Sequence, residues 1–156
     1  MPRLSVFLLL VWGAVAAQAP QSVYLLPMAS GLDQHLASRL AADGNVRVVT
    51  DVKLADAVFT DKLGEGFEGK LAELLRPKED ETAEKKKKEQ EERPRLSFQG
   101  RSRGNVFLVD PKSRQVIWST YERSKSAAPE ALEKTARQIV ERLKKDLFSA
   151  AKTPGN

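Results

Sequence analysis

A glycine-rich segment comes closer than any other stretch of this sequence to a known binding motif. It reads Gly64-Glu65-Gly66-Phe67-Glu68-Gly69-Lys70, which matches G-x-G-x-x-G and much of a phosphate-binding loop. Leu71 stands where such a loop needs a hydroxyl for Mg²⁺, and Glu65 and Glu68 would repel a phosphate. The pattern therefore favours a turn with acids at a helix start. A small-ligand or phosphate-binding module near Gly66 stays open as an alternative.

Acidic side chains at the ends of predicted strands are the second candidate for chemistry. Two carboxylates that lie a few ångströms apart can carry acid/base hydrolysis of a sugar or peptide polymer. Turn and cap roles also explain each of these residues by itself. A hydrolase that acts through strand-end carboxylates is therefore the alternative enzymatic function. The aspartates concerned are Asp51, Asp56, Asp61 and Asp110.

Histidine and cysteine chemistry is poorly represented. His35 is the one histidine, no cysteine occurs, and no second ligand or partnering serine pattern accompanies His35, so neither a metal site nor a catalytic triad is predicted. We expect His35 at a helix surface or boundary. The missing cysteine excludes disulfides, a thiol nucleophile and the acylated cysteine of lipoproteins. We therefore expect a protein that is not an enzyme, with no catalytic residue, no cofactor and no metal.

The charge pattern predicts no nucleic-acid partner. The net charge is +5, but the basic residues stand among many acids and do not gather on one face. Residues 76–95 are mostly charged and contain almost nothing apolar, and the run Lys85–Lys88 is flanked by Glu84 and Glu89. Such a stretch cannot bury a core, so we interpret it as a charged low-complexity insertion that acts as a solvated tether.

The first residues have the layout of an export signal. Arg3 precedes an apolar run, Val6–Trp12, and small residues continue it, which predicts cleavage between Ala17 and Gln18, or one residue earlier. The run is shorter than the roughly 20 residues of a membrane-spanning helix. We expect a signal peptide at 1–17 and a single domain at 18–156 that is exported, periplasmic or secreted. Neither a transmembrane segment in the mature protein nor a lipid anchor is expected.

Hydrophobic periodicity predicts the elements that position these residues. Ser30 and Asp33 should cap the first helix, and Pro129 should begin a long final helix. Trp118 should pack in the core on the face that it shares with Val116 and Thr120. The fold class is α/β (α+β), a single mixed sheet of about five strands in the order β-α-β-β-α-β-β-α, with a C-terminal hairpin plus a long helix. Strands are expected at 22–28, 46–50, 57–60, 106–109 and 115–121, and helices at 30–43, 67–75 and 129–147.

Three stretches carry a resemblance to known proteins. Val23–Met28 is an apolar strand that ends at a proline, Leu54–Asp61 is a strand led by Ala-Asp, and Val106–Ser119 is a hairpin whose turn opens with Asp and whose second strand holds Trp. They resemble the periplasmic α/β domains of bacterial envelope proteins, namely the N-terminal domain of TolB, the activator LpoB and the curli exporter CsgG. The resemblance implies a non-enzymatic binding or adaptor domain whose partner is another cell-envelope protein or assembly. The alternative hydrolase would then act on an envelope polymer.

Overall fold

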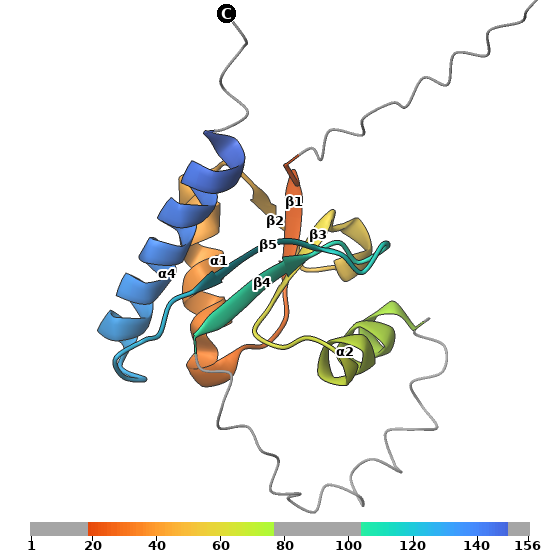
Figure 1. The fold of residues 1–156 in the computed structure, drawn as a ribbon, viewed down its shortest axis with the longest axis horizontal. Coiled ribbons are helices and arrows are strands. Elements are labelled where there is room, and N and C mark those ends of the chain that lie inside the picture. Colours follow the sequence, from red (N-terminus) through yellow and green to blue (C-terminus); the bar gives the residue numbers. More distant parts are fainter. Residues whose placement is uncertain (1–18, 77–103, 150–156) are drawn as a thin grey trace, which may run out of the picture.

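The computed structural model describes residues 19–76 and 104–149. These residues form one five-stranded mixed sheet in the order β2-β1-β3-β4-β5, with three α-helices (Figure 1). The predicted α/β class, element order, hairpin and long final helix are confirmed. The signal peptide with its cleavage site at Ala17 and Gln18, and nearly all of the charged insertion, lie outside the described residues. The strands are β1 (Ser22–Leu25), β2 (Arg47–Val48), β3 (Ala57–Thr60), β4 (Asn105–Val109) and β5 (Val116–Tyr121), and the helices are α1 (Leu32–Asp43), α2 (Glu65–Leu75) and α4 (Pro129–Leu143).

Parallel and antiparallel pairing divide the sheet. β1 lies between β2 and β3 and runs parallel to both, with Val23 beside Val48 and Ala57. β3, β4 and β5 then pair in antiparallel fashion. The β4–β5 turn opens at Asp110, as predicted, because its Oδ1 accepts the N–H of Lys112 at 2.8 Å. This local bond bends the chain back without help from distant residues.

Helices cover the two faces of the sheet unequally. α1 and α4 lie side by side on one face, and α2 packs on the other (Figure 1). The larger core forms where apolar side chains of α1 and α4 recur every three or four residues and meet alternate residues of the strands. Its fully buried members include Val23, Leu36, Ala57, Phe59, Val106, Leu108, Ala136 and Ile139. The smaller core, under α2, consists of Leu26, Val52, Val58, Phe67, Leu71 and Val109.

The predicted start of the first helix is wrong in one respect. Ser30 has a left-handed conformation (φ 60°) and makes no cap bond, and α1 begins at Leu32. Asp33 nevertheless reaches back to accept the N–H of Met28 at 3.0 Å. The Asp33 carboxylate therefore fixes the turn before α1, while Gly31, the N-cap residue, supplies no side-chain cap. The helix ends at Gly44, as predicted.

The predicted face of Trp118 needs a correction as well. Trp118 is buried in the larger core, where its indole N–H donates to Asp146 at 2.9 Å. Leu108 pairs with Trp118, but the next pair joins Val109 to Val116, which marks a β-bulge in β5. A bulge adds one residue and reverses the alternation of side chains beyond it. Val116 therefore lies on the α2 face, opposite to Trp118.

Candidate functional site

The four candidate aspartates are used as acceptors for turns and caps. Asp51 accepts the N–H of Lys53 at 2.9 Å, and Asp110 accepts those of Lys112 and Ser113. Asp56 Oδ2 lies 2.9 Å from the N–H of Ser22 and 2.8 Å from its hydroxyl. Each of these contacts fixes a turn or a strand end.

The structure also separates Asp61 from Asp56 and Asp110 along the sheet. Asp56 precedes β3 and Asp61 follows it, so their α-carbons are roughly 16 Å apart at strand spacing. Asp110 lies at the same end of the sheet as Asp56, since Val109 pairs with Val58 in antiparallel register. Among the described residues, the contacts of Asp56 and Asp110 are with N–H and hydroxyl donors. The geometry therefore gives no support to an acid/base pair built from these four aspartates.

Asp56 joins the start of β1 to the start of β3. The Ser22 hydroxyl is the main cause of a lowered pKa of Asp56, and the N–H groups of Ser22 and Gln21 add to it. A depressed carboxyl pKa stabilises the fold above the ordinary value and loses that effect as the pH falls through the folded-state pKa. The pKa of Asp110 is lowered as well, mainly by the hydrogen bond from the Lys112 N–H, so its contribution to stability has the same dependence on pH.

Replacing Asp56 with alanine should lower the free energy of unfolding by about 1 kcal/mol at neutral pH, a value reduced because the carboxylate is partly exposed. The difference from the wild type should shrink as the pH falls below the ordinary carboxyl pKa and through the lowered pKa of Asp56, because the wild type then loses the charge that accepts these contacts. Urea unfolding followed by circular dichroism at several pH values measures it. A difference that is constant with pH would contradict the assignment.

The glycine-rich segment does not form a phosphate loop. Gly66 and Gly69 lie inside α2, where their N–H groups are not presented to a ligand by a loop. Glu68 pairs with Arg114 at 3.0 Å, and Lys70 pairs with Glu73 at 3.5 Å. The predicted turn followed by acids in a first helical turn is confirmed.

Replacing Gly69 with alanine should raise the free energy of unfolding by about 0.5–1 kcal/mol, because alanine loses less conformational entropy in a helix than glycine. An added Cβ meets no atom within 4 Å. Urea unfolding measures this gain. A loss of stability, together with saturable heat on titration of the wild type with inorganic phosphate, would instead favour a phosphate site.

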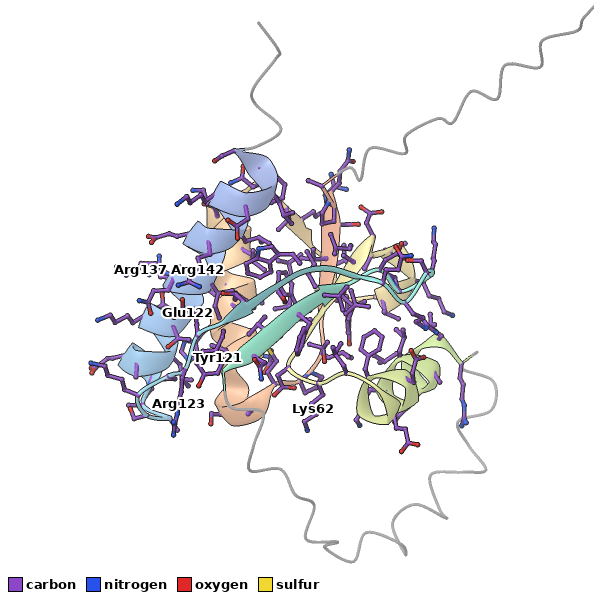
Figure 2. The ribbon with its side chains drawn as sticks, in the orientation of Figure 1. Lys62, Tyr121, Glu122, Arg123, Arg137 and Arg142 are labelled. Carbon is purple, nitrogen blue, oxygen red and sulfur yellow. The ribbon has the colours of Figure 1, made fainter. Side chains whose placement is uncertain are left out.

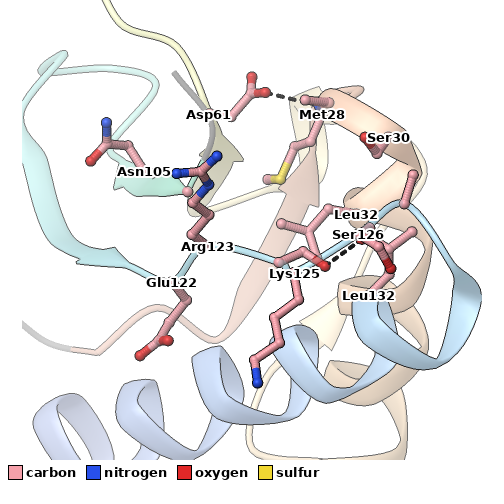
Figure 3. Close-up of a pocket in the computed structure, with 14 residues that line it drawn as sticks. Met28, Ser30, Leu32, Asp61, Asn105, Glu122, Arg123, Lys125, Ser126 and Leu132 are labelled. Atoms are coloured by element: carbon pink, nitrogen blue, oxygen red, sulfur yellow. Dashed lines mark hydrogen bonds between the residues drawn. The ribbon is translucent and has the colours of Figure 1, made fainter. Parts of the chain in front are cut away.

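A cavity of about 240 Å³ opens at the carboxyl ends of β1 and β3. Figure 2 places Tyr121, Glu122 and Arg123 in succession where β5 leads toward α4. The walls come from the turn after β1, from Asp61 after β3, from the start of β4 and from residues 122–127. Figure 3 shows Arg123 extending toward the end of the cavity that holds Asp61, whereas Lys125 extends away from it.

Two buried carboxylates hold the turn that forms one wall of this cavity. Asp33 Oδ1 accepts the N–H of Met28 at 3.0 Å, and Asp61 Oδ2 accepts the N–H of Ala29 at 2.9 Å. The N–H groups of two consecutive residues are therefore each bonded to a carboxylate, one from α1 and one from the segment after β3. The turn is positioned by both elements, so the cavity has a defined wall.

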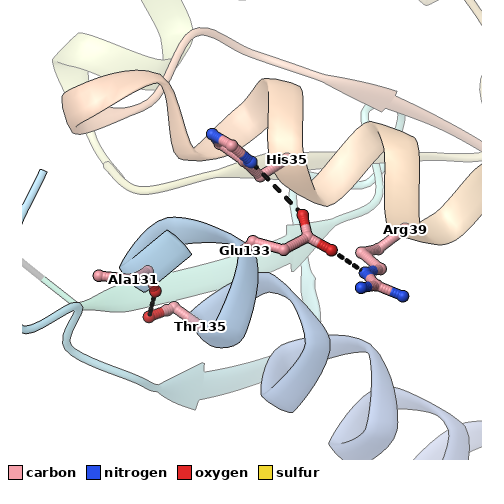
Figure 4. Close-up of polar contacts among 5 residues, drawn as sticks. All are labelled: His35, Arg39, Ala131, Glu133 and Thr135. Atoms are coloured by element: carbon pink, nitrogen blue, oxygen red, sulfur yellow. Dashed lines mark hydrogen bonds and ion pairs between the residues drawn. The ribbon is translucent and has the colours of Figure 1, made fainter. Parts of the chain in front are cut away.

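His35 takes part in a polar contact between α1 and α4. Its Nδ1 lies 3.4 Å from Glu133 Oε2, and the Arg39 guanidinium donates to the other oxygen of Glu133 (Figure 4). Burial by itself would raise the pKa of Glu133, but hydrogen bonds from Arg39 and His35 bring it below its ordinary value. His35 is partly exposed and ties the two helices together, in agreement with the predicted boundary position.

One edge of the sheet is long and the other is short. In the described ranges, β5 has six residues and pairs with β4 alone, whereas β2 has two residues. On the α2 face of β5, the side chains of Val116 and Tyr121 are 45% and 57% exposed. β5 therefore presents an open hydrogen-bonding edge next to exposed apolar surface.

Arg123 and its cavity were not predicted from the sequence. The segment Glu122–Ala128 has no apolar period and reads as a serine-rich connection with two basic residues. Such connections are common between a strand and a helix, so the composition of this one does not indicate a binding site. The relevant signal is its position beside β1 and β3, which depends on the sheet order.

No helix of residues 19–76 and 104–149 is long and apolar enough to cross a membrane. Within the same ranges, no three His, Cys, Asp or Glu side chains gather in a way that could hold a metal ion. Comparison with protein-family models, with curated proteins and with solved structures finds no match to this chain.

Proposed function

We propose that this chain is an exported, non-enzymatic binding domain that docks on another protein of the cell envelope. The observation that carries the proposal is the edge of β5, which pairs with no strand of the described residues other than β4. An open edge strand can accept an extended segment of a partner as an additional strand, with backbone hydrogen bonds for affinity and side chains for specificity. Export rests on Arg3 and the apolar run that follows it.

The outward-facing groups of β5 follow from its pairing with β4. The N–H of Glu122 donates to the carbonyl of Gly104 at 2.7 Å. Hydrogen-bonded pairs alternate along an antiparallel ladder, so Thr120 bonds to β4 while the N–H and C=O of Ser119 face the open edge. Ser119 is exposed. Its backbone therefore lies at the centre of the surface offered to a partner.

The exposed side chains next to this edge are of a kind that protein partners commonly cover. Val116 and Tyr121 flank the free backbone groups of Ser119 on one face. Aromatic residues are enriched at protein interfaces because they bury a large area and keep a polar tip. Long unprotected edge strands also promote aggregation, so an exported protein with this edge gains from a partner that covers it.

The test is cross-linking of the full-length chain in cells of its native host, followed by envelope fractionation and mass spectrometry. Expected results are a mature N-terminus at Gln18 or Ala17 and a reproducibly captured envelope protein. Replacing Ser119 with proline should abolish the capture, because proline removes the outward N–H and leaves the ladder to β4 intact. Serine to threonine at the same position is the matched control and should retain capture.

Two outcomes would overturn the proposal. Retention of the unprocessed chain in the cytosol would contradict the proposed export. Equal capture by the proline and threonine variants would remove β5 as the docking edge. Circular dichroism of both purified variants establishes that they are folded, so a loss of capture can be assigned to the edge itself.

A further inference from the structure

The cavity beside Arg123 lies at the point where the chain changes direction across the sheet. From β1, helix α1 leads over one face to β2, and the next connection returns over the other face, where Val52 packs, to reach β3 on the far side of β1. Open α/β sheets bind ligands outside the carboxyl ends of the strands at such a switch point. The loops after β1 and β3 diverge there and leave room between them.

Two opposite charges, those of Asp61 and Arg123, face this cavity, and neither forms an ion pair with another described residue. Asp61 is 6% exposed, and one of its oxygens accepts the Ala29 N–H. Its other oxygen has no hydrogen bond, and no ion pair within 4.0 Å joins Asp61 or Arg123 to another residue of the described ranges. That oxygen is open to the cavity, because no fully buried side-chain oxygen of the described residues lacks a hydrogen-bond partner. The cavity therefore offers a site for a cation at Asp61 and for an anion at Arg123.

The rest of the lining limits the size and polarity of a ligand. Met28, Leu32 and Leu132 are buried and form an apolar wall. Ser30 contributes a hydroxyl that makes no hydrogen bond with the described residues. A volume of about 240 Å³ lies below the range of roughly 300–1,000 Å³ that is usual for drug-sized ligands.

We propose that this cavity binds a free α-amino acid with an apolar side chain. The α-ammonium group would contact Asp61, the α-carboxylate would contact the guanidinium of Arg123, and the side chain would pack on Leu32 and Leu132. A simple anion would satisfy Arg123 but would leave Asp61 unpaired and repelled. A simple cation would pair with Asp61 but would leave Arg123 unpaired and repelled. Because β5 is not involved, this inference is independent of the docking proposal.

Isothermal titration calorimetry with L-leucine tests the inference. N-acetyl-L-leucine lacks the ammonium charge, and L-leucinamide lacks the carboxylate. L-leucine should bind about 10-fold or more tightly than either derivative, since each removes one charge-assisted contact. Absence of saturable heat with L-leucine at millimolar concentration would overturn the proposal. Equal binding of N-acetyl-L-leucine would reduce the site to an anion site and would overturn it too.

Variants locate the site. Arg123 is exposed and unpaired in the described part of the chain, so Arg123→Gln should fold normally and weaken L-leucine binding by about 10-fold or more. Arg137→Gln, the same change at an exposed arginine of α4 (Figure 2), should leave binding unchanged. Asp61→Asn keeps an acceptor for the Ala29 N–H and should also weaken binding by about 10-fold or more. Equal effects of Arg123→Gln and Arg137→Gln would contradict the assignment.

Discussion

Replacing Phe59 with alanine should lower the free energy of unfolding by about 3–5 kcal/mol, the largest effect that we expect from a single side chain. Phe59 lies in β3, the central strand, between Leu25 of β1 and Leu108 of β4. Its ring is fully buried in the larger core. Alanine would leave a cavity between the sheet and the helices that the surrounding rigid strands cannot close. Urea unfolding at constant m-value measures the loss.

Leu54 provides the matched control for Phe59. It lies in the connection that precedes β3, and its side chain is 67% exposed. Leu54→Ala should change the free energy of unfolding by less than about 0.5 kcal/mol. A loss below about 1 kcal/mol for Phe59→Ala would contradict the described packing of α1 and α4 on the sheet.

Replacing Gly104 with alanine should lower the free energy of unfolding by about 2–3 kcal/mol, from backbone strain and a steric clash together. Gly104 has a φ of +116°, which L side chains rarely adopt, and an added Cβ would lie 3.0 Å from Tyr121 Cε2 and 3.2 Å from the backbone of Arg123. Tyr121 therefore covers the glycine at the start of β4. Relief of the clash must displace Arg123, so L-leucine binding should weaken in the same variant.

Gly69→Ala is the comparison for Gly104→Ala, because the same change in α2 meets open space and should be stabilising. A higher free energy of unfolding for Gly69→Ala and a lower one for Gly104→Ala would agree with the described backbone. A neutral Gly104→Ala, with unaltered L-leucine binding, would show that the β4 start and the β5 end are arranged differently. Urea unfolding and calorimetry give both measurements.

Much of the fold could be predicted because its elements have strong local patterns. Leu132, Ala136 and Ile139 trace one face of α4, and all are buried as the spacing predicts. Asp110 opens the hairpin turn through a bond to Lys112, two residues away. β2 was predicted too long, since Val46 and Thr50 lie outside the strand, although the N–H of Val49 still donates to the carbonyl of Val23 at 2.9 Å. Strand ends depend on the partner strand, which local propensity does not contain.

The candidate site was harder to predict than the fold. Asp56 was recognised as a strand-end acid, but its contacts with Gln21 and Ser22 come from a distant part of the chain. The bulge that moves Val116 away from the face of Trp118 depends on how β5 pairs with β4. Arg123 had no pattern that distinguished it from other loop cations.

The sequence by itself determined the α/β class, the order of the elements, the hairpin turn and the long apolar face of α4, because hydrophobic period and turn chemistry act over a few residues. Only the tertiary structure decided that β1 lies between β2 and β3, that β5 is the open edge, and that Asp61 and Arg123 face one cavity. These features depend on contacts between residues far apart in the chain. Such contacts are selected by the joint packing of both cores, so no single segment encodes them.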